Sequence, residues 1–210
     1  MRRSSVLITA AFCLCASGQT PPVEKALGMP PRAAATDYQA HAQAGAVTIA
    51  AEFTGHAVPM PQETLSTEDF VVVEIAFFGP PETRLKLSLD DFSLRVNKKK
   101  TALSNQPFGL VFHSLKNPDL EPPSTAAKSK TNVGSGGQGD SAPAPVFHLP
   151  PEVRHAMQQH VQKAALPEGD RVPPQAGLIF FQYRGKTENI QSLELIYNGP
   201  AGKATLSLQP

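Results

Sequence analysis

The sequence predicts a mainly β fold, an antiparallel sandwich of seven or eight strands with one inserted helix at about residues 151–165. Three observations support this prediction. Short segments rich in β-branched and aromatic residues recur along the chain, helices and strands do not alternate, and the 21 prolines among 210 residues are about twice the usual share. Because a parallel sheet needs crossover helices between its strands, antiparallel pairing is expected.

The segment Phe70–Val96 carries the strongest fold signal. Seven of the nine residues in Phe70–Phe78 are β-branched or aromatic, and both faces of this segment are apolar except at Glu74, which is typical of a central strand. A Gly-Pro-Pro turn ends the strand and leads into a returning strand, which forms a hairpin with it. The apolar alternation of the returning strand slips by one residue at Asp90-Asp91, which predicts a bulge or a corner where the strand changes sheets.

Further strands are expected where short apolar runs are bounded by turn-forming residues, at 46–53, 101–103, 108–115, 177–183, 192–197 and 204–208. The residues that join the last two runs, 198–202, contain two glycines and one proline and are typical of a hairpin connection. No internal repeat is visible. These runs give the predicted count of seven or eight strands.

One helix is predicted, from Pro151 to about Ala165. Proline suits the first helical position, and Glu152 suits the positive end of the helix dipole. Val153, Met157 and Val161 recur every four residues and form a narrow apolar stripe. We expect this helix to pack across one end or edge of the sandwich.

The first 18 residues are typical of a secretory signal peptide. Two arginines precede a short apolar run, Val6 to Cys15, and small residues follow up to Gly18, after which cleavage is expected. The run is too short to cross a bilayer, which needs about 20 residues. A lipid anchor on Cys13 or Cys15 is the alternative, although Phe12 and Leu14 stand where a lipoprotein signal has a small residue. The chain is therefore expected to be exported, to the periplasm or outside the cell.

The rest of the chain is expected to form a single β-sandwich domain over residues 45–210, preceded by a flexible tether over 19–44. The tether is rich in Ala, Pro and Gln. An insertion at about 118–146 interrupts the domain. Thirteen of the 28 residues in 118–145 are Pro, Gly or Ser, and such a segment cannot bury enough apolar surface to offset the entropy of ordering it.

The charge of the mature chain gives no indication of nucleic-acid or membrane binding. Removal of residues 1–18 takes away two of the 19 basic residues and none of the 18 acidic ones, so the charge becomes 17 − 18 = −1. Both cysteines are removed as well. The mature protein can therefore have no internal disulfide, no thiol nucleophile and no thiolate metal site. No transmembrane helix is expected in it.

No residue is predicted to be catalytic, to bind a cofactor or to bind a metal. His155 and His160 are five residues apart on the helix, whereas ligands on one helical face need a spacing of three or four. The neighbouring carboxylates Asp90-Asp91 and Glu68-Asp69 would point to opposite faces of a strand. No serine lies in a nucleophile-elbow motif, and the glycine cluster near residue 136 lacks the lysine of a phosphate-binding loop.

Parts of the chain resemble uncharacterised exported bacterial proteins that are similar to the immunoglobulin-like domains of bacterial surface lipoproteins. The resemblance covers roughly Val47 to Leu208. It rests on Asp91-Phe92-Ser93-Leu94, which matches a D-F-x-L strand after the first hairpin, and on Gly177-Leu178-Ile179-Phe180-Phe181, which matches a late G-x-x-x-F strand. It implies an immunoglobulin-like sandwich and no catalytic residue, whereas the insertion and the helix depart from a simple sandwich.

These features predict an exported, non-enzymatic module that binds a protein or a component of the cell envelope. A rigid sandwich with a tether and a long insertion suits an interaction domain. Two alternatives remain open. One is a metal-binding carrier that uses His113, His148 and a helix histidine near the insertion. The other is an accessory domain, or a hydrolase whose site is assembled from loops.

Overall fold

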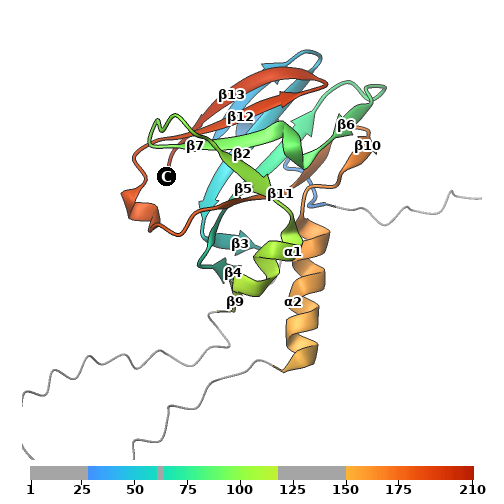
Figure 1. Ribbon diagram of the computed structural model, residues 1–210. Helices are drawn as coiled ribbons and strands as arrows, with labels where there is room; N and C mark the ends of the chain where they lie inside the picture. The colour runs from blue at the N-terminus through green and yellow to red at the C-terminus, as the bar shows by residue number, and fades with distance from the viewer. Residues whose placement is uncertain (1–27, 61–63, 118–149) are drawn as a thin grey trace, which may run out of the picture.

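The computed structural model describes residues 28–60, 64–117 and 150–210 (Figure 1). The expected signal peptide at 1–18, the first part of the expected tether and the expected insertion at 118–146 lie outside these residues. The described residues are mainly β, and their sheets are antiparallel. None of the helices among them is long and apolar enough to cross a membrane.

Thirteen strands are present in the described residues, which corrects the expected seven or eight. They are β1 (Ala40–Ala44), β2 (Val47–Gly55), β3 (Ala57–Pro59), β4 (Thr64–Thr67), β5 (Phe70–Phe78), β6 (Leu85–Leu87), β7 (Phe92–Val96), β8 (Leu103–Gln106), β9 (Leu115–Lys116), β10 (Gly169–Arg171), β11 (Gln175–Gln182), β12 (Leu193–Gly199) and β13 (Gly202–Leu208). Six of them, β3, β4, β6, β8, β9 and β10, have only two to four residues. Apart from β6, which was expected as part of the returning strand, strands this short show too few alternations for a sequence pattern to reveal them.

Two α-helices accompany these strands, α1 (Phe108–Val111) and α2 (Pro151–Ala164), together with the 3₁₀ turns η1 (Ala35–Asp37), η2 (Leu89–Asp91), η3 (Phe112–Ser114) and η4 (Thr187–Asn189). The predicted helix is confirmed as α2. The strand expected over 108–115 is wrong, because this segment forms α1 and η3 and only its last residue belongs to β9. Phe108 and Val111 pack into one core while Gly109 and Leu110 are exposed, and this burial follows helical spacing rather than alternation.

The largest sheet has eight strands in the order β1-β2-β5-β11-β8-β7-β12-β13. Strand β8 joins its two halves, since Leu103 and Ser104 pair with β7 while Asn105 and Gln106 pair with β11. The two end strands, β1 and β13, lie side by side. Beside them, the Gln39 side-chain amide donates to the Gln209 carbonyl oxygen at 2.9 Å. The sheet is therefore nearly closed.

Strand β5 is central, as predicted, because it pairs with β2 on one side and β11 on the other. The predicted hairpin between β5 and the returning strand is wrong. Both edges of β5 are already occupied, and the returning strand β6 pairs instead with β10. The predicted break at Asp90-Asp91 is confirmed. There η2 separates β6, in a two-stranded ribbon, from β7, in the eight-stranded sheet.

Two large cores occupy the opposite faces of β5. Its residues Val71, Val73, Ile75 and Phe77 lie in the core enclosed by the nearly closed sheet. Phe70 and Val72 lie in a second core on the outer face of the sheet, with Leu178 and Phe180 of β11. Burial on both faces explains why the strand has almost no polar positions.

Helix α2 covers the outer core through its C-terminal half, where Met157, Val161 and Ala164 are buried. It therefore packs on a face of the sheet. The sequence had suggested packing across one end or edge instead. Figure 1 shows the N-terminal half of α2 extending away from the sheet. At the exit of the helix, a Cβ on Gly177 would lie 2.4 Å from Leu166 Cα, so only glycine allows this close approach.

The tether expected over 19–44 extends too far, because residues 28–44 pack against the sheet. Ala40–Ala44 form β1 and pair with β2 in full register. Ala44 is buried, and Ala40 and Ala42 pack against the same core. An alternating run of alanines carries little hydrophobic signal, so its composition suggested a linker rather than a strand.

Candidate functional site

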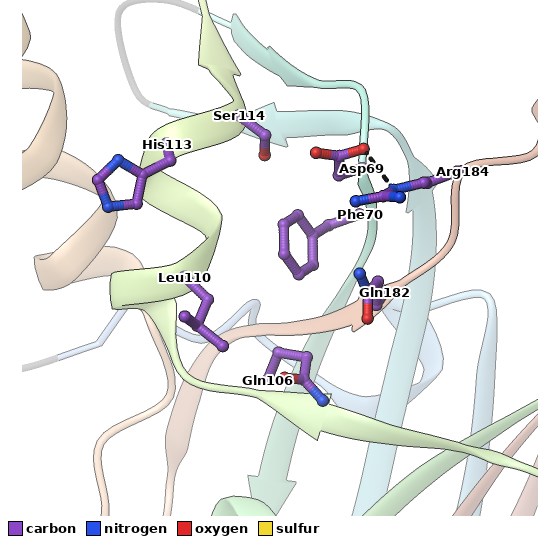
Figure 2. Close-up of a pocket in the computed structure, with 8 residues that line it drawn as sticks. All are labelled: Asp69, Phe70, Gln106, Leu110, His113, Ser114, Gln182 and Arg184. Atoms are coloured by element: carbon purple, nitrogen blue, oxygen red, sulfur yellow. Dashed lines mark hydrogen bonds and ion pairs between the residues drawn. The ribbon is translucent and has the colours of Figure 1, made fainter.

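A hollow of about 240 Å³ lies where α1 meets the ends of β5, β8 and β11 (Figure 2). We call it the Phe70 pocket. It is lined by Asp69, Phe70, Gln106, Leu110, His113, Ser114, Gln182 and Arg184. Four separate segments supply these residues: the start of β5, the end of β8, the α1–η3 turn and the end of β11.

The apolar part of the pocket consists of Phe70 and Leu110. Phe70 is only 6% exposed and is packed into the outer core. Leu110, on α1, is 54% exposed, and among the described residues Val172 is the only other large apolar side chain that is exposed. Figure 2 shows both residues at the same hollow, Leu110 on α1 and Phe70 at the start of β5. An exposed leucine beside a buried ring provides a site where a further apolar group can lose contact with water.

The polar rim contains an ion pair. Arg184 Nε donates to Asp69 Oδ1 at 2.9 Å, and the Arg184 side chain is 72% exposed. The backbone reinforces this contact, because the amide of Tyr183 donates to the Asp69 carbonyl oxygen at 2.8 Å. Among the described residues only Nε of the guanidinium is bonded, so the hydrogen-bonding capacity of its terminal nitrogens is not used there. The Gln182 side chain is exposed at the same rim.

Behind the pocket, the imidazole of His56 connects two segments. Its Nδ1 lies 2.7 Å from the Phe70 carbonyl oxygen, and its Nε2 lies 2.9 Å from the Gly185 carbonyl oxygen. The ring stacks on Tyr183 with centroids 6.4 Å apart. Thr67 adds a further support, since its Oγ1 accepts from the Phe70 amide at 3.1 Å. The pocket wall is thus held by buried and half-buried polar contacts rather than by packing alone.

The hydroxyl and imidazole at the pocket do not form a nucleophile–base pair. Ser114 Oγ donates to the Val111 carbonyl oxygen at 2.9 Å and lies 3.1 Å from Thr67 Oγ1. Figure 2 shows the His113 ring pointing away from Phe70, and it packs against Phe112. A serine nucleophile would need a base within hydrogen-bond reach of its hydroxyl.

The other histidines are dispersed. His41 lies on β1, and His155 and His160 are exposed on α2, where His155 Nε2 contacts Gln159 at 2.9 Å. His148 lies outside the described residues. Within residues 28–60, 64–117 and 150–210, no three His, Cys, Asp or Glu side chains come together as metal ligands. The metal-carrier alternative therefore stays a hypothesis that involves His148.

The two carboxylate pairs behave differently from each other. Glu68 and Asp69 take separate partners, Lys116 and Arg184. At the other pair, burial raises the pKa of Asp91, and the neighbouring charge of Asp90 raises it further. Asp91 Oδ2 is buried, and no hydrogen-bond partner for it lies among the described residues.

Asp91 and Tyr197 flank a glycine. A Cβ on Gly199 would lie 2.5 Å from Asp91 Oδ2 and 2.5 Å from the Tyr197 hydroxyl, so both polar atoms face the same backbone. Burial also raises the pKa of Tyr197. The Tyr197 hydroxyl accepts from the Ala201 amide at 3.4 Å and so supports the β12–β13 turn. We assign this arrangement to the structure of the hairpin.

A second hollow, of about 250 Å³, is formed by residues 83–86, the β12–β13 turn and Val47. Arg84 and Lys86 are exposed around it. Its apolar residues Leu85 and Tyr197 already belong to the enclosed core. Unlike the Phe70 pocket, it contains no large apolar side chain that is exposed.

Sequence reasoning missed the Phe70 pocket. Its decisive contacts join residues that are 115 positions apart, Asp69 and Arg184, or 129 apart, His56 and Gly185. The one local signal is Leu110, an apolar residue on the exposed side of the short helix α1. This signal can be recognised only once residues 108–111 are known to be helical.

No family model, no curated protein and no solved structure matches this chain.

Proposed function

We propose that this protein is an exported, non-enzymatic binding module that captures a protein of the cell envelope through the Phe70 pocket. The observation that carries the proposal is Leu110, which is 54% exposed and lines the same pocket as the buried ring of Phe70. Exposing a leucine to water is unfavourable, and apolar side chains gathered beside a polar rim are typical of interaction sites.

The size of the pocket favours one anchoring side chain over a small-molecule ligand. Sites for cofactors and drug-sized ligands have volumes of roughly 300–1,000 Å³, whereas the Phe70 pocket has about 240 Å³. Protein interfaces are commonly centred on one or two buried anchors surrounded by polar contacts. An apolar side chain of a partner would fill the space between Phe70 and Leu110.

The rim suggests the neighbouring groups of the partner. The terminal nitrogens of Arg184 can donate to a carboxylate, and the exposed amide of Gln182 can bond to a peptide backbone. The partner chemistry is therefore an apolar anchor residue followed or preceded by an acidic residue. The self-contained hydrogen bonds of Ser114 and the orientation of His113 support a binding role over the hydrolase alternative.

The likeness to immunoglobulin-like domains of bacterial surface lipoproteins belongs to the same proposal. The residues on which it rests fall in strands of the eight-stranded sheet. Asp91–Leu94 leads from η2 into β7, and Gly177–Phe181 lies in β11 beside β5. The signal-peptide pattern of residues 1–18 supports export and a final place in the periplasm or outside the cell.

Photo-crosslinking from the pocket rim tests the proposal. A photoreactive amino acid in place of Gln182 is expected to crosslink one envelope protein, which mass spectrometry identifies. Leu110→Asp should lower that yield about tenfold, as for loss of an interface anchor. Val172→Asp is the matched control, because Val172 is 44% exposed but lies outside the pocket. Wild-type yield from the Leu110→Asp variant, or absence of any specific crosslink, would contradict the proposal.

A further inference from the structure

The two ring nitrogens of His56 face the same kind of atom. Nδ1 lies 2.7 Å from the carbonyl oxygen of Phe70, and Nε2 lies 2.9 Å from the carbonyl oxygen of Gly185. A carbonyl oxygen can only accept a hydrogen bond. A neutral imidazole carries one N–H and one lone pair, whereas the imidazolium carries two N–H groups. Only the protonated ring can therefore make both bonds.

These bonds join a rigid segment to a loop. Phe70 is the first residue of β5 and pairs with Gln182 in the sheet, so its carbonyl oxygen is fixed. Gly185 belongs to residues 183–186, which leave the end of β11 and which we call the Arg184 loop. When His56 is neutral, the bond from Nδ1 to the fixed Phe70 oxygen can persist, and the bond to the Gly185 oxygen is then lost.

The Arg184 loop forms one side of the Phe70 pocket. Arg184 and Gln182 both line the pocket, and Arg184 is held there by Asp69. The His56–Gly185 contact is a second, part-buried attachment of this loop. Loss of that attachment leaves the exposed Arg184–Asp69 ion pair and the Tyr183 amide to position the rim, and an exposed ion pair alone is weak.

Within the described parts of the chain, few other titratable groups lie near the ring. The Tyr183 phenol stacks on it from the end of β11. The elements around it also carry the Asp69–Arg184 pair, the Glu68–Lys116 pair, and Lys186 and Glu188 after Gly185. Among the described residues, the hydrogen bonds of the imidazole are those to Phe70 and Gly185 alone. Histidine itself is the side chain that changes charge in the range of pH 5 to 8.

We propose that protonation of His56 sets the affinity of the Phe70 pocket. At acidic pH the imidazolium holds the Arg184 loop against β5 and the rim is formed. At alkaline pH the loop loses one attachment and the rim loosens. This inference rests on the proposed function of the pocket in partner binding, and it adds the conditions under which the pocket is ready to bind.

Nuclear magnetic resonance of the free protein tests the switch without any partner. We expect the amide resonances of Arg184 and Gly185 to titrate with the midpoint of the His56 ring. We also expect amide exchange in the Arg184 loop, corrected for intrinsic rates, to be about fivefold slower in the acidic form, as for one hydrogen bond. Arg184-loop resonances that stay unchanged while the His56 ring titrates would overturn the proposal.

His56→Phe provides the matched variant, because an aromatic ring can keep the stacking on Tyr183 while both N–H groups are lost. Its Arg184 loop should resemble the alkaline wild type at every pH. The same titration of the loop in His56→Phe as in the wild type would overturn the proposal. If this variant does not fold, the wild-type titration alone decides.

The crosslinking yield from position 182 separates this inference from the proposed function. We expect the yield of the wild type to be higher at acidic pH, where the imidazolium holds the Arg184 loop, and the comparison of pH 5.5 with pH 8 measures this. A specific crosslink of equal yield at both values would overturn the switch and leave the pocket as a binding site. A third outcome is no crosslink at either pH together with Arg184-loop resonances that titrate. It would refute the pocket as a binding site and the claim about its affinity, but the pH-dependent attachment of the Arg184 loop would stand.

Discussion

Glu52 on β2 and Glu74 on β5 lie directly opposite each other in the sheet, and the guanidinium of Arg32 pairs with both. Its contact with Glu74 is 2.9 Å long, and the Glu74 side chain is only 8% exposed. Arg32 also donates to the Asp37 carbonyl oxygen at 2.7 Å and lies over the Tyr38 ring, 4.5 Å from its centroid. Hydrogen bonding to Glu52, and then to Glu74, raises the pKa of Arg32.

Arg32→Ala is expected to destabilise the protein by about 2 kcal/mol. The loss leaves two carboxylates facing each other, one of them buried, and like charges directly opposite in a sheet repel. The cost stays below the 3–5 kcal/mol of a fully buried pair because Arg32 and Glu52 are partly exposed. Urea unfolding measures it, and adding Glu52→Gln to Arg32→Ala should recover part of the loss.

Arg95→Ala is the matched control for this prediction. Arg95 on β7 and Glu194 on β12 also lie opposite each other in neighbouring strands. Their side chains are partly exposed, and Arg95 Nη1 lies 2.8 Å from Glu194 Oε2. In the described part of the chain Arg95 pairs with no second carboxylate, so loss of this pair should cost no more than about 1 kcal/mol. Equal effects of the two substitutions would show that the Glu52–Glu74 juxtaposition is not what Arg32 stabilises.

Asp91→Asn is expected to stabilise the protein at pH 7 and to have no such effect below pH 3.5. Burial raises the pKa of Asp91 in the folded state above the unfolded value of about 3.9. The folded state therefore binds the proton more tightly, and stability falls as the pH rises from the unfolded pKa through the folded one. Asp91→Asn removes the carboxylate charge, so the variant does not lose this stability as the pH rises.

Urea unfolding of wild type and Asp91→Asn between pH 3 and 8 measures the difference between them. Asp90→Asn is the control, since Asp90 is exposed and acts on Asp91 only through its charge, so its gain should be smaller. A difference between wild type and Asp91→Asn that does not change with pH would contradict the assignment.

The sequence predicted those elements whose signal is local. β5 and β11 have apolar runs that suit burial on two faces, α2 has a four-residue apolar spacing, and the slip at Asp90-Asp91 located the change of sheet. Strand partners could not be predicted, because β5 is joined by a turn to β6 yet pairs with β2 and β11. The pocket could not be predicted for the same reason, since the Asp69–Arg184 contact depends on the pairing of β5 with β11.

Gly177→Ala is expected to destabilise the protein by roughly 1–3 kcal/mol, the usual cost of overpacking. The new Cβ would lie 2.4 Å from Leu166 Cα and 2.6 Å from Leu166 N, and backbone atoms cannot rotate away. The change would separate α2 from β11.

Gly109→Ala is the control, because a Cβ there meets nothing within 4 Å. In helix α1 that substitution should be neutral or stabilising. Thermal unfolding of both variants decides, and similar losses at the two sites would refute the role given to Gly177.

Substitutions of Phe70 and Leu110 should have different effects, the first on the stability of the fold and the second on partner binding. Phe70→Ala is expected to cost about 3–5 kcal/mol of stability, because its ring is buried in the outer core. Leu110→Ala should change stability by no more than about 0.5 kcal/mol, as for an exposed side chain, yet it should weaken partner capture. Urea unfolding and the crosslinking yield from position 182 measure the two effects. If Leu110→Ala destabilised the fold as Phe70→Ala does, Leu110 would be a core residue, and its exposure could not support a binding role for the pocket.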